Sequence, residues 1–201
     1  VRRVLWTPVL LALAAFFVFV MGTFAPGDPA ELRLGNRATP ESIERERERL
    51  GLNDPIPVRY ARYVANVLQG DFGDSYHYQG RPVLEIITPR LWVSVQLNIA
   101  ALIVAILIGL PLGFYAAKKQ GTASDPAIVI SMLILYAMPV FFTAPFLILF
   151  FAVKLHWVPA AGWGGFFSPQ IVLPALTIGI PGAAIFVRHM RASTLEVVGQ
   201  E

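Results

Sequence analysis

The sequence predicts an all-α membrane protein, a polytopic bundle of transmembrane helices. Of its 201 residues, 56% are hydrophobic, against about 45–50% in a typical soluble domain. The charged residues leave four long uncharged stretches: residues 4–27, 91–117, 126–153 and, with only His156 inside it, 155–187. Because a helix crosses the bilayer core of roughly 30 Å with about 20 residues, each stretch is long enough for one span. We therefore expect four spans in this chain.

The first uncharged stretch has two interpretations. Arg2 and Arg3 followed by an apolar run are also typical of a cleaved signal peptide. The apolar run of a signal peptide is usually only about 7–15 residues long and ends at a small-x-small cleavage site. The run here is longer, and Gly-Thr-Phe-Ala at residues 22–25 is a poor cleavage site. We favour a retained N-terminal transmembrane helix in residues 1–27.

Most of the remaining charge lies in residues 28–90, which we expect to form a small helical extracytoplasmic segment. Thr39 and Pro40 suit the start of a helix, and Gly51 suits its end. The helix carries acid–base pairs one turn apart, at Glu41–Arg45 and Glu46–Arg49. The alternative is that these charges only keep the helix solvated, because surface ion pairs contribute little.

A second helix is expected to begin near Pro57 and to end at Gly70. Its apolar positions follow the spacing of one buried helix face, at Tyr60, Val64, Val67 and Leu68. Residues 70–75, Gly-Asp-Phe-Gly-Asp-Ser, are typical of a turn. Pro82 then opens a short helix over residues 83–87 that leads into the second span.

The short loops predict the orientation of the chain. Positive charge in short loops marks the cytoplasmic side. With four crossings, three basic clusters fall on that one side: Arg2 and Arg3, Lys118 and Lys119, and Arg188 and Arg191. Residues 25–90 and 152–170 then lie on the outer side, and both ends of this chain are cytoplasmic.

The four uncharged stretches contain helix-disturbing residues instead of ionisable ones. Since intramembrane ionisable residues usually mark ion or proton pathways, their absence argues against an ion-driven carrier. Proline and glycine occur in three of the spans, at Pro111, Gly113, Pro139, Pro145, Pro174, Gly179, Pro181 and Gly182. Kinks at these positions suit a bundle that bends or opens. Irregular packing explains them equally well, because both residue types are frequent in membrane helices.

Uncharged polar residues in the spans have two possible roles. They could line a wet pathway, or they could join helices by hydrogen bonds; for any single residue we favour the second role. The candidate pathway-lining residues are Gln96, Asn98, Tyr136, Thr143 and Thr177.

The sequence shows no catalytic, cofactor-binding or metal-binding motif. It contains no cysteine and no G-x-x-x-x-G-K-[ST] loop for ATP. It also lacks H-E-x-x-H and G-x-S-x-G, the motifs of zinc and serine hydrolases. The histidines have no acidic partner at metal-ligand spacing. An intramembrane hydrolase is the enzymatic alternative, and no residue pattern favours it.

A series of short motifs resembles the permease subunits of bacterial dipeptide and oligopeptide ATP-binding-cassette importers, a family that includes nickel importers. The resemblance covers nearly the whole chain, and the order and spacing of the motifs make it specific. Before the second span they are Phe24-Ala25-Pro26-Gly27-Asp28-Pro29, Leu50-Gly51-Leu52-Asn53-Asp54-Pro55 with Pro57, Gly70-Asp71-Phe72-Gly73-Asp74-Ser75, Arg81-Pro82-Val83, Glu85-Ile86-Ile87 and Arg90-Leu91. After it come Pro111-Leu112-Gly113, Arg188, Arg191, Ser193 and Leu195.

The resemblance implies a permease that does no chemistry and needs partners. These are a second permease subunit, identical or different, two cytoplasmic ATPase subunits, and an extracytoplasmic binding protein that delivers the peptide. No nucleic acid is involved. The membrane would be the bacterial or archaeal plasma membrane. The resemblance also makes the end of the last span a candidate coupling region, at Arg188, Arg191 and Glu196.

Family members continue into a coupling loop, Y-V-R-T-A-R-A-K-G, and two more spans. We therefore expect six spans in the complete protein and a chain that stops before the coupling loop. The expected division is 1–27, 28–90 and 91–201, the last being the permease core. A membrane scaffold or sensor whose residues 28–90 bind a ligand is the alternative function. The substrate, whether dipeptide, oligopeptide or nickel, stays open.

Overall fold

The computed structural model describes residues 2–35, 38–78 and 80–198. Within those ranges the regular elements are helices, joined by loops and by one isolated bridge between Asp74 and Pro82. Three helices are long and apolar enough to cross a membrane, and a bent helix pair raises the number to four if the pair counts as one span. The prediction of an all-α polytopic membrane protein is confirmed.

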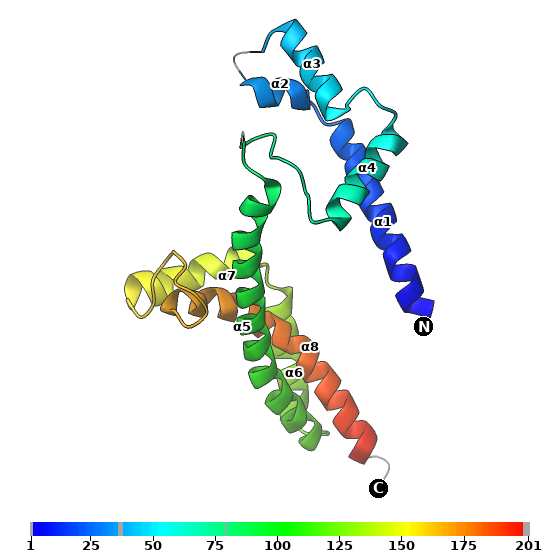
Figure 1. The fold of residues 1–201 in the computed structure, drawn as a ribbon. Coiled ribbons are helices and arrows are strands. Elements are labelled where there is room, and N and C mark those ends of the chain that lie inside the picture. Colours follow the sequence, from blue (N-terminus) through cyan, green and yellow to red (C-terminus); the bar gives the residue numbers. More distant parts are fainter. Residues whose placement is uncertain (1, 36–37, 79, 199–201) are drawn as a thin grey trace. The chain divides into compact units, whose positions relative to one another are not determined.

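The chain divides into two compact units, Val1–Pro89 and Arg90–Glu201. The first unit contains α1 (Arg2–Thr23), α2 (Pro29–Leu34), α3 (Pro40–Leu50) and α4 (Ile56–Leu68). The second contains α6 (Ser124–Ala137), α7 (Val140–Leu147), a π-helical segment (Ile148–Lys154), a 3-10 turn (Pro169–Ile171) and α8 (Val172–Val198). Helix α5 (Val83–Lys118) begins in the first unit and runs through the second (Figure 1).

In the first unit, α3 begins and ends as its sequence predicts. Thr39 caps the helix with a reciprocal hydrogen-bond pair to Ser42, and Gly51 ends it in the left-handed conformation at φ 63°. Of the two expected ion pairs, Glu46–Arg49 forms, with 3.6 Å between Oε2 and Nη1. Arg45 instead donates from Nε to the backbone carbonyl of Glu41 at 3.2 Å.

Helix α4 packs on α1 through aromatic side chains. The Tyr60 ring lies 5.0 Å from the Phe16 ring and 5.6 Å from the Phe19 ring, measured between centroids. The Tyr60 hydroxyl donates to the carbonyl oxygen of Ala12 at 2.7 Å. The predicted apolar face of α4 is only partly buried, because Leu68 at its end is 82% exposed.

The expected short helix over residues 83–87 is not a separate element. Its residues form the first turns of α5, a single helix of 36 residues. At 1.5 Å per residue this helix is about 54 Å long, well beyond the roughly 30 Å of a bilayer core. Residues 83–87 and the second span therefore belong to one continuous helix.

In the second unit, α5 and α8 approach closely along small residues. A Cβ atom on Gly179 would lie 2.7 Å from the carbonyl oxygen of Ala101, and one on Gly113 would lie 2.7 Å from that of Val187. The contacts advance in the same direction along both helices, so the helices run parallel. Small residues in transmembrane helices allow such close backbone approach. Gly113 and Gly179, expected as helix disturbers, are packing positions.

The third span is broken, as its prolines suggest. Helix α6 ends at Ala137, and the segment from Val140 to Lys154 continues at an angle of 96°. Met138 adopts an extended conformation, with ψ at 123°, which is the preference of a residue that precedes proline. By contrast, α8 continues as one helix through Pro181, and α5 continues through Pro111.

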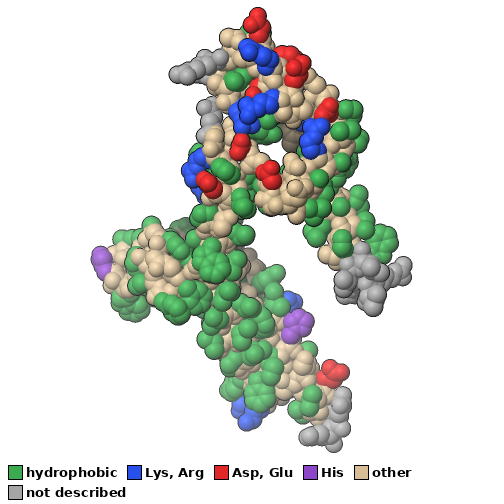
Figure 2. Space-filling model, viewed as in Figure 1, with side chains coloured by type: hydrophobic (Ala, Val, Ile, Leu, Met, Phe, Trp, Pro, Cys, Tyr) green, Lys and Arg blue, Asp and Glu red, His purple; other side chains and the backbone are tan. Residues whose placement is uncertain are grey.

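The fourth span begins after the expected outer loop at residues 152–170 but ends later than expected. Residues 155–168 form a loop, and α8 extends to Val198, past the predicted end at residue 187. Arg188 and Arg191 consequently lie on the helix itself and not beyond it. Figure 2 shows the two kinds of surface: Lys, Arg, Asp and Glu side chains gather over α2–α4, whereas hydrophobic side chains cover most of α5.

Candidate translocation and coupling sites

Two of the five candidate pathway residues meet at one cavity. Thr143 of α7 and Thr177 of α8 both line a cavity of about 360 Å³ beside the break between α6 and α7. The other lining residues are apolar: Leu135, Met138, Phe142, Phe146, Leu147, Leu176, Ile180 and Pro181. The cavity thus lies at the place where the third span changes direction.

The hydroxyls of both threonines are bonded within their own helices. Thr177 donates from Oγ1 to the carbonyl oxygen of Leu173 at 2.6 Å. Thr143 donates from Oγ1 to that of Val140 at 3.3 Å. Because these donors are already used, the cavity is an apolar space and offers little for hydration. Neither threonine hydroxyl joins two helices in these bonds.

The other three pathway candidates are not part of this cavity. Asn98 donates from Nδ2 to the carbonyl oxygen of Ser94, 2.8 Å away on the same helix. Gln96 is half-buried on α5, and Tyr136 is exposed on α6. Their role as pathway-lining residues stays a prediction.

The candidate coupling residues occupy the last turns of α8 and differ in their surroundings. Arg188 and Glu196 are exposed. Arg191 instead forms a two-fold contact with Asp125 in the first turn of α6: Nε to Oδ1 is 2.6 Å and Nη2 to Oδ2 is 2.6 Å. Asp125 is only 6% exposed. The structure therefore places one of the three candidates in an ion pair between α6 and α8, in which the carboxylate is buried and the arginine is half-buried.

Sequence reasoning missed Asp125 and the small-residue face of α5. Asp125 follows the basic loop and opens a helix, where the positive end of the helix dipole favours a carboxylate. Its position at the start of a helix could therefore have marked Asp125 as a candidate from the sequence. The face of α5 was also visible as a small residue at every fourth position: Ala101, Ala105, Gly109, Gly113 and Ala117. Most of these residues are buried against α8.

The packing also brings the basic clusters of the second unit together. The end of α5 lies beside Val187 and Met190 of α8, and the start of α6 contacts Arg191. Lys118, the last residue of α5, and Lys119, which follows it, therefore lie at the same end of the unit as the last turns of α8. This arrangement supports the prediction that these charges share one side of the membrane.

In the first unit, the charged residues of α2 and α3 form a network and not only a solvated surface. Arg47 contacts Asp28 at 2.7 Å between Nε and Oδ2. Arg33 contacts Asp74 at 2.6 Å and Glu46 at 3.5 Å. These ion pairs join α2 to the turn at residues 71–75 and to α3, and they join α3 to Asp28, the residue that caps α2.

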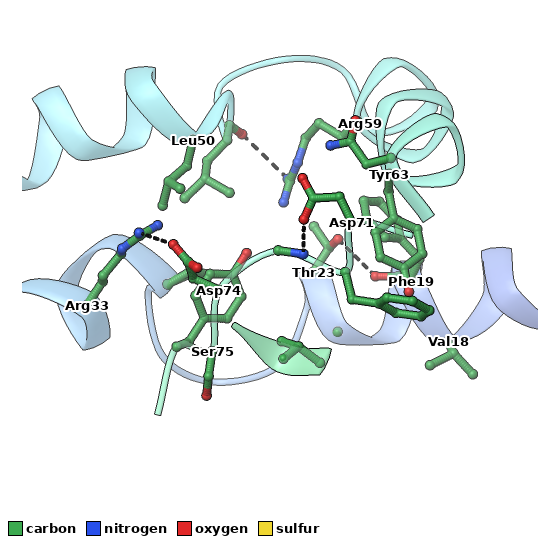
Figure 3. Close-up of a pocket in the computed structure, with 18 of the residues that line it drawn as sticks. Val18, Phe19, Thr23, Arg33, Leu50, Arg59, Tyr63, Asp71, Asp74 and Ser75 are labelled. Atoms are coloured by element: carbon green, nitrogen blue, oxygen red, sulfur yellow. Dashed lines mark hydrogen bonds and ion pairs between the residues drawn. The ribbon is translucent and has the colours of Figure 1, made fainter. Parts of the chain in front are cut away.

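A cavity of about 1560 Å³ opens between α1 and this network. Figure 3 shows the side chains of Arg33, Arg59, Asp71 and Asp74 directed into it. The Arg59 guanidinium carbon lies 5.8 Å from the centre of the Phe19 ring. The Asp71 carboxylate accepts a hydrogen bond from the backbone N–H of Gly73 at 2.8 Å. Among the described residues, no three His, Asp or Glu side chains gather closely enough to hold a metal ion.

Comparison with known proteins covers almost the entire chain. Residues 1–98 match the family described as binding-protein-dependent transport system membrane component, N-terminal. Residues 109–201 match the family described as binding-protein-dependent transport system inner membrane component.

Curated relatives carry related names. The chain is 34% identical, over all of its length and 66% of the relative, to a probable peptide ABC transporter permease protein (y4tP) of Sinorhizobium fredii. It is 33% identical to the oligopeptide transport system permease protein OppB of Salmonella typhimurium, over 95% of this chain and 61% of the relative. It is 32% identical to the oligopeptide transport system permease protein AppB of Bacillus subtilis, over 100% of this chain and 66% of the relative. The chain thus spans slightly less than two thirds of the length of these relatives.

Proposed function

Because the chain belongs to the family of binding-protein-dependent transport system inner membrane components, we propose that it is a permease subunit of an ATP-driven peptide importer. It would form part of the wall of the translocation pathway for peptides. The observation that carries this proposal is the match of both family descriptions, in sequence order, to residues 1–98 and 109–201. Relatives named as peptide and oligopeptide permeases support the choice of substrate class.

The residues of the chain indicate which tasks in transport must fall to other subunits. Its spans carry no ion-binding side chains, and the sequence has no phosphate-binding loop. The energy for transport therefore comes from two cytoplasmic ATPase subunits. A second permease subunit completes the pathway, and an extracytoplasmic binding protein delivers the peptide. The chain itself would catalyse no reaction.

The proposed orientation gives each surface a partner. Residues 28–90 and the loop at residues 155–168 face the binding protein on the outer side. The last turns of α8, with the exposed Arg188 and Glu196, face the ATPase. The apolar cavity at Thr143 and Thr177 lies in the wall of the pathway, where the broken third span leaves room for movement.

The test is to co-express the full-length gene product that contains these residues with a second permease and the ATPase subunits, and to purify the assembly in detergent. After reconstitution into proteoliposomes with the binding protein, uptake of a defined tripeptide should require ATP. An ATPase variant that cannot hydrolyse ATP is the control and should give no uptake. An assembly that never contains an ATPase, but whose residues 28–90 bind a ligand, would favour the scaffold or sensor function.

The orientation can be tested by cysteine labelling. Because the sequence has no native cysteine, only the introduced cysteine can react. Phe167, 97% exposed in the outer loop, and Gln120, exposed between α5 and α6, are each replaced by cysteine. A membrane-impermeant maleimide added to intact cells should label Phe167→Cys and leave Gln120→Cys unlabelled until the membrane is opened. The reverse pattern would exclude the proposed sidedness.

A further inference from the structure

We propose that Asp125 and Arg191 are a positioning pair that holds the cytoplasmic end of α8 against α6, so that movement of one helix is passed to the other during transport. The inference rests on the proposed function, because it assigns the pair a part in coupling ATP hydrolysis to peptide movement. Neither residue would contact peptide or ATP. Each would act by fixing the position of the helix that the other residue belongs to.

The geometry is that of a rigid link. The guanidinium of Arg191 uses two of its N–H groups on the two oxygens of Asp125, each at 2.6 Å. Planar two-point contacts of this kind fix direction as well as distance, which a lysine cannot do. The 6% exposure of Asp125 removes it from competing water. Its place in the first turn of α6 adds a favourable interaction with the helix dipole.

The scarcity of acidic residues makes this contact specific. After residue 90 the sequence has three of them, Asp125, Glu196 and Glu201. The described side chain of Glu196 is exposed near the end of α8. Asp125 is therefore the acid that α6 offers to this part of α8. Replacing Arg191 would leave the carboxylate of Asp125, which is 6% exposed, without its ion-pair partner.

The position of the pair suits transmission between two functional regions. Arg191 lies less than one turn after the exposed Arg188, which the proposed function assigns to the ATPase side. Asp125 is the second of the 14 residues of α6, so about 20 Å of helix separate it from the break at Met138 and Pro139. The apolar cavity lies at that far end. A displacement of the end of α8 would thus tilt α6 and change the cavity.

The experiment uses the complete permease assembled with its second permease, ATPase subunits and binding protein in proteoliposomes. The variants are Asp125→Asn, Arg191→Gln, Arg191→Lys and the exchange Asp125→Arg with Arg191→Asp. The matched control is Lys119→Gln, which removes an exposed charge from the neighbouring loop. Three quantities are measured: yield of the assembly, ATP hydrolysis without binding protein, and tripeptide taken up per ATP hydrolysed.

A positioning role predicts a specific loss of coupling. The single variants should assemble and hydrolyse ATP without binding protein as the wild type does, but uptake per ATP should fall at least about fivefold, the lower end of typical coupling between sites. Uptake per ATP should fall less in Arg191→Lys than in Arg191→Gln. The double variant Asp125→Arg with Arg191→Asp should recover part of the lost uptake per ATP. The recovery should be incomplete because an arginine at the N-terminus of α6 is repelled by the positive end of the helix dipole. The control should match the wild type.

Two results would overturn the inference. One is uptake per ATP that is unchanged in all variants. The other is a loss that only follows the yield of the assembly, with normal coupling in every complex that forms, because that would make the pair a purely structural contact. Failure of the proposed function looks different: the wild-type assembly itself would then show no ATP-dependent uptake.

Discussion

Replacing Gly179 of α8 with alanine should disturb the contact between α5 and α8, whereas the same replacement at Gly182 should not. A Cβ atom on Gly179 would lie 2.7 Å from the carbonyl oxygen of Ala101 and 2.7 Å from Cβ of Val104. On Gly182 the nearest neighbour would be Cβ of Ala105 at 3.6 Å, an ordinary contact. Both glycines lie inside the same helix, so the gain in helix propensity is common to both changes.

The magnitude follows from two opposing effects. Alanine is favoured over glycine inside a helix by about 1 kcal/mol. Overpacking against a neighbour that cannot move freely costs about 1–3 kcal/mol, and the neighbour of Gly179 is a backbone carbonyl. Gly182→Ala should thus be neutral or stabilising, and Gly179→Ala should be less stable than Gly182→Ala by about 1–3 kcal/mol.

The assay is thermal unfolding of the purified protein in one detergent. Samples are heated to a series of temperatures, and the fraction that stays folded is measured by size-exclusion chromatography. For a chain of this length 1 kcal/mol corresponds to a shift in Tm of about 2–4 °C. The Tm values of the two variants should therefore differ by roughly 2–12 °C, with that of Gly182→Ala the higher. Equal Tm values, or a lower value for Gly182→Ala, would refute the close parallel packing of α5 and α8.

Three further substitutions test single contacts. Thr39→Ala removes the hydroxyl that caps α3 and should cost about 1 kcal/mol, seen as faster hydrogen exchange in the first turn of that helix. His156→Gly relieves a left-handed backbone at φ 55° and should raise stability by about 1 kcal/mol; a lower Tm would contradict this. Tyr60→Phe keeps the ring contacts with α1 but loses the bond to Ala12, so stability should fall by about 1 kcal/mol if α1 and α4 pack as described.

Much of the first unit's secondary structure could be predicted because short-range rules determine it. The threonine cap and the glycine end of α3 act within a few residues of the chain, and both are found where the sequence places them. The charge network could not be predicted in the same way. It joins Arg33 to Asp74, 41 positions away in the sequence, and no local pattern identifies that partner.

The candidate sites show the same limit. The sequence identified Thr143, Thr177 and Arg191 as polar or charged residues in or near spans, but it could not say which of them meet. Thr143 and Thr177 meet at one cavity because the third span breaks at Pro139 and α7 packs against α8. Arg191 meets Asp125, 66 positions before it. Proline marked the place of the break, but its angle of 96° depends on the surrounding helices.

The sequence by itself determined that the chain is a helical membrane protein, where its apolar stretches lie, and which family its motifs resemble. Hydropathy, capping and motif order are properties of neighbouring residues, so they can be read without a structure. Tertiary structure alone decided that Gly113 and Gly179 are contact points between parallel helices, and that Asp125 holds Arg191. These roles depend on which helix faces which, and that choice is made by the packing of distant segments.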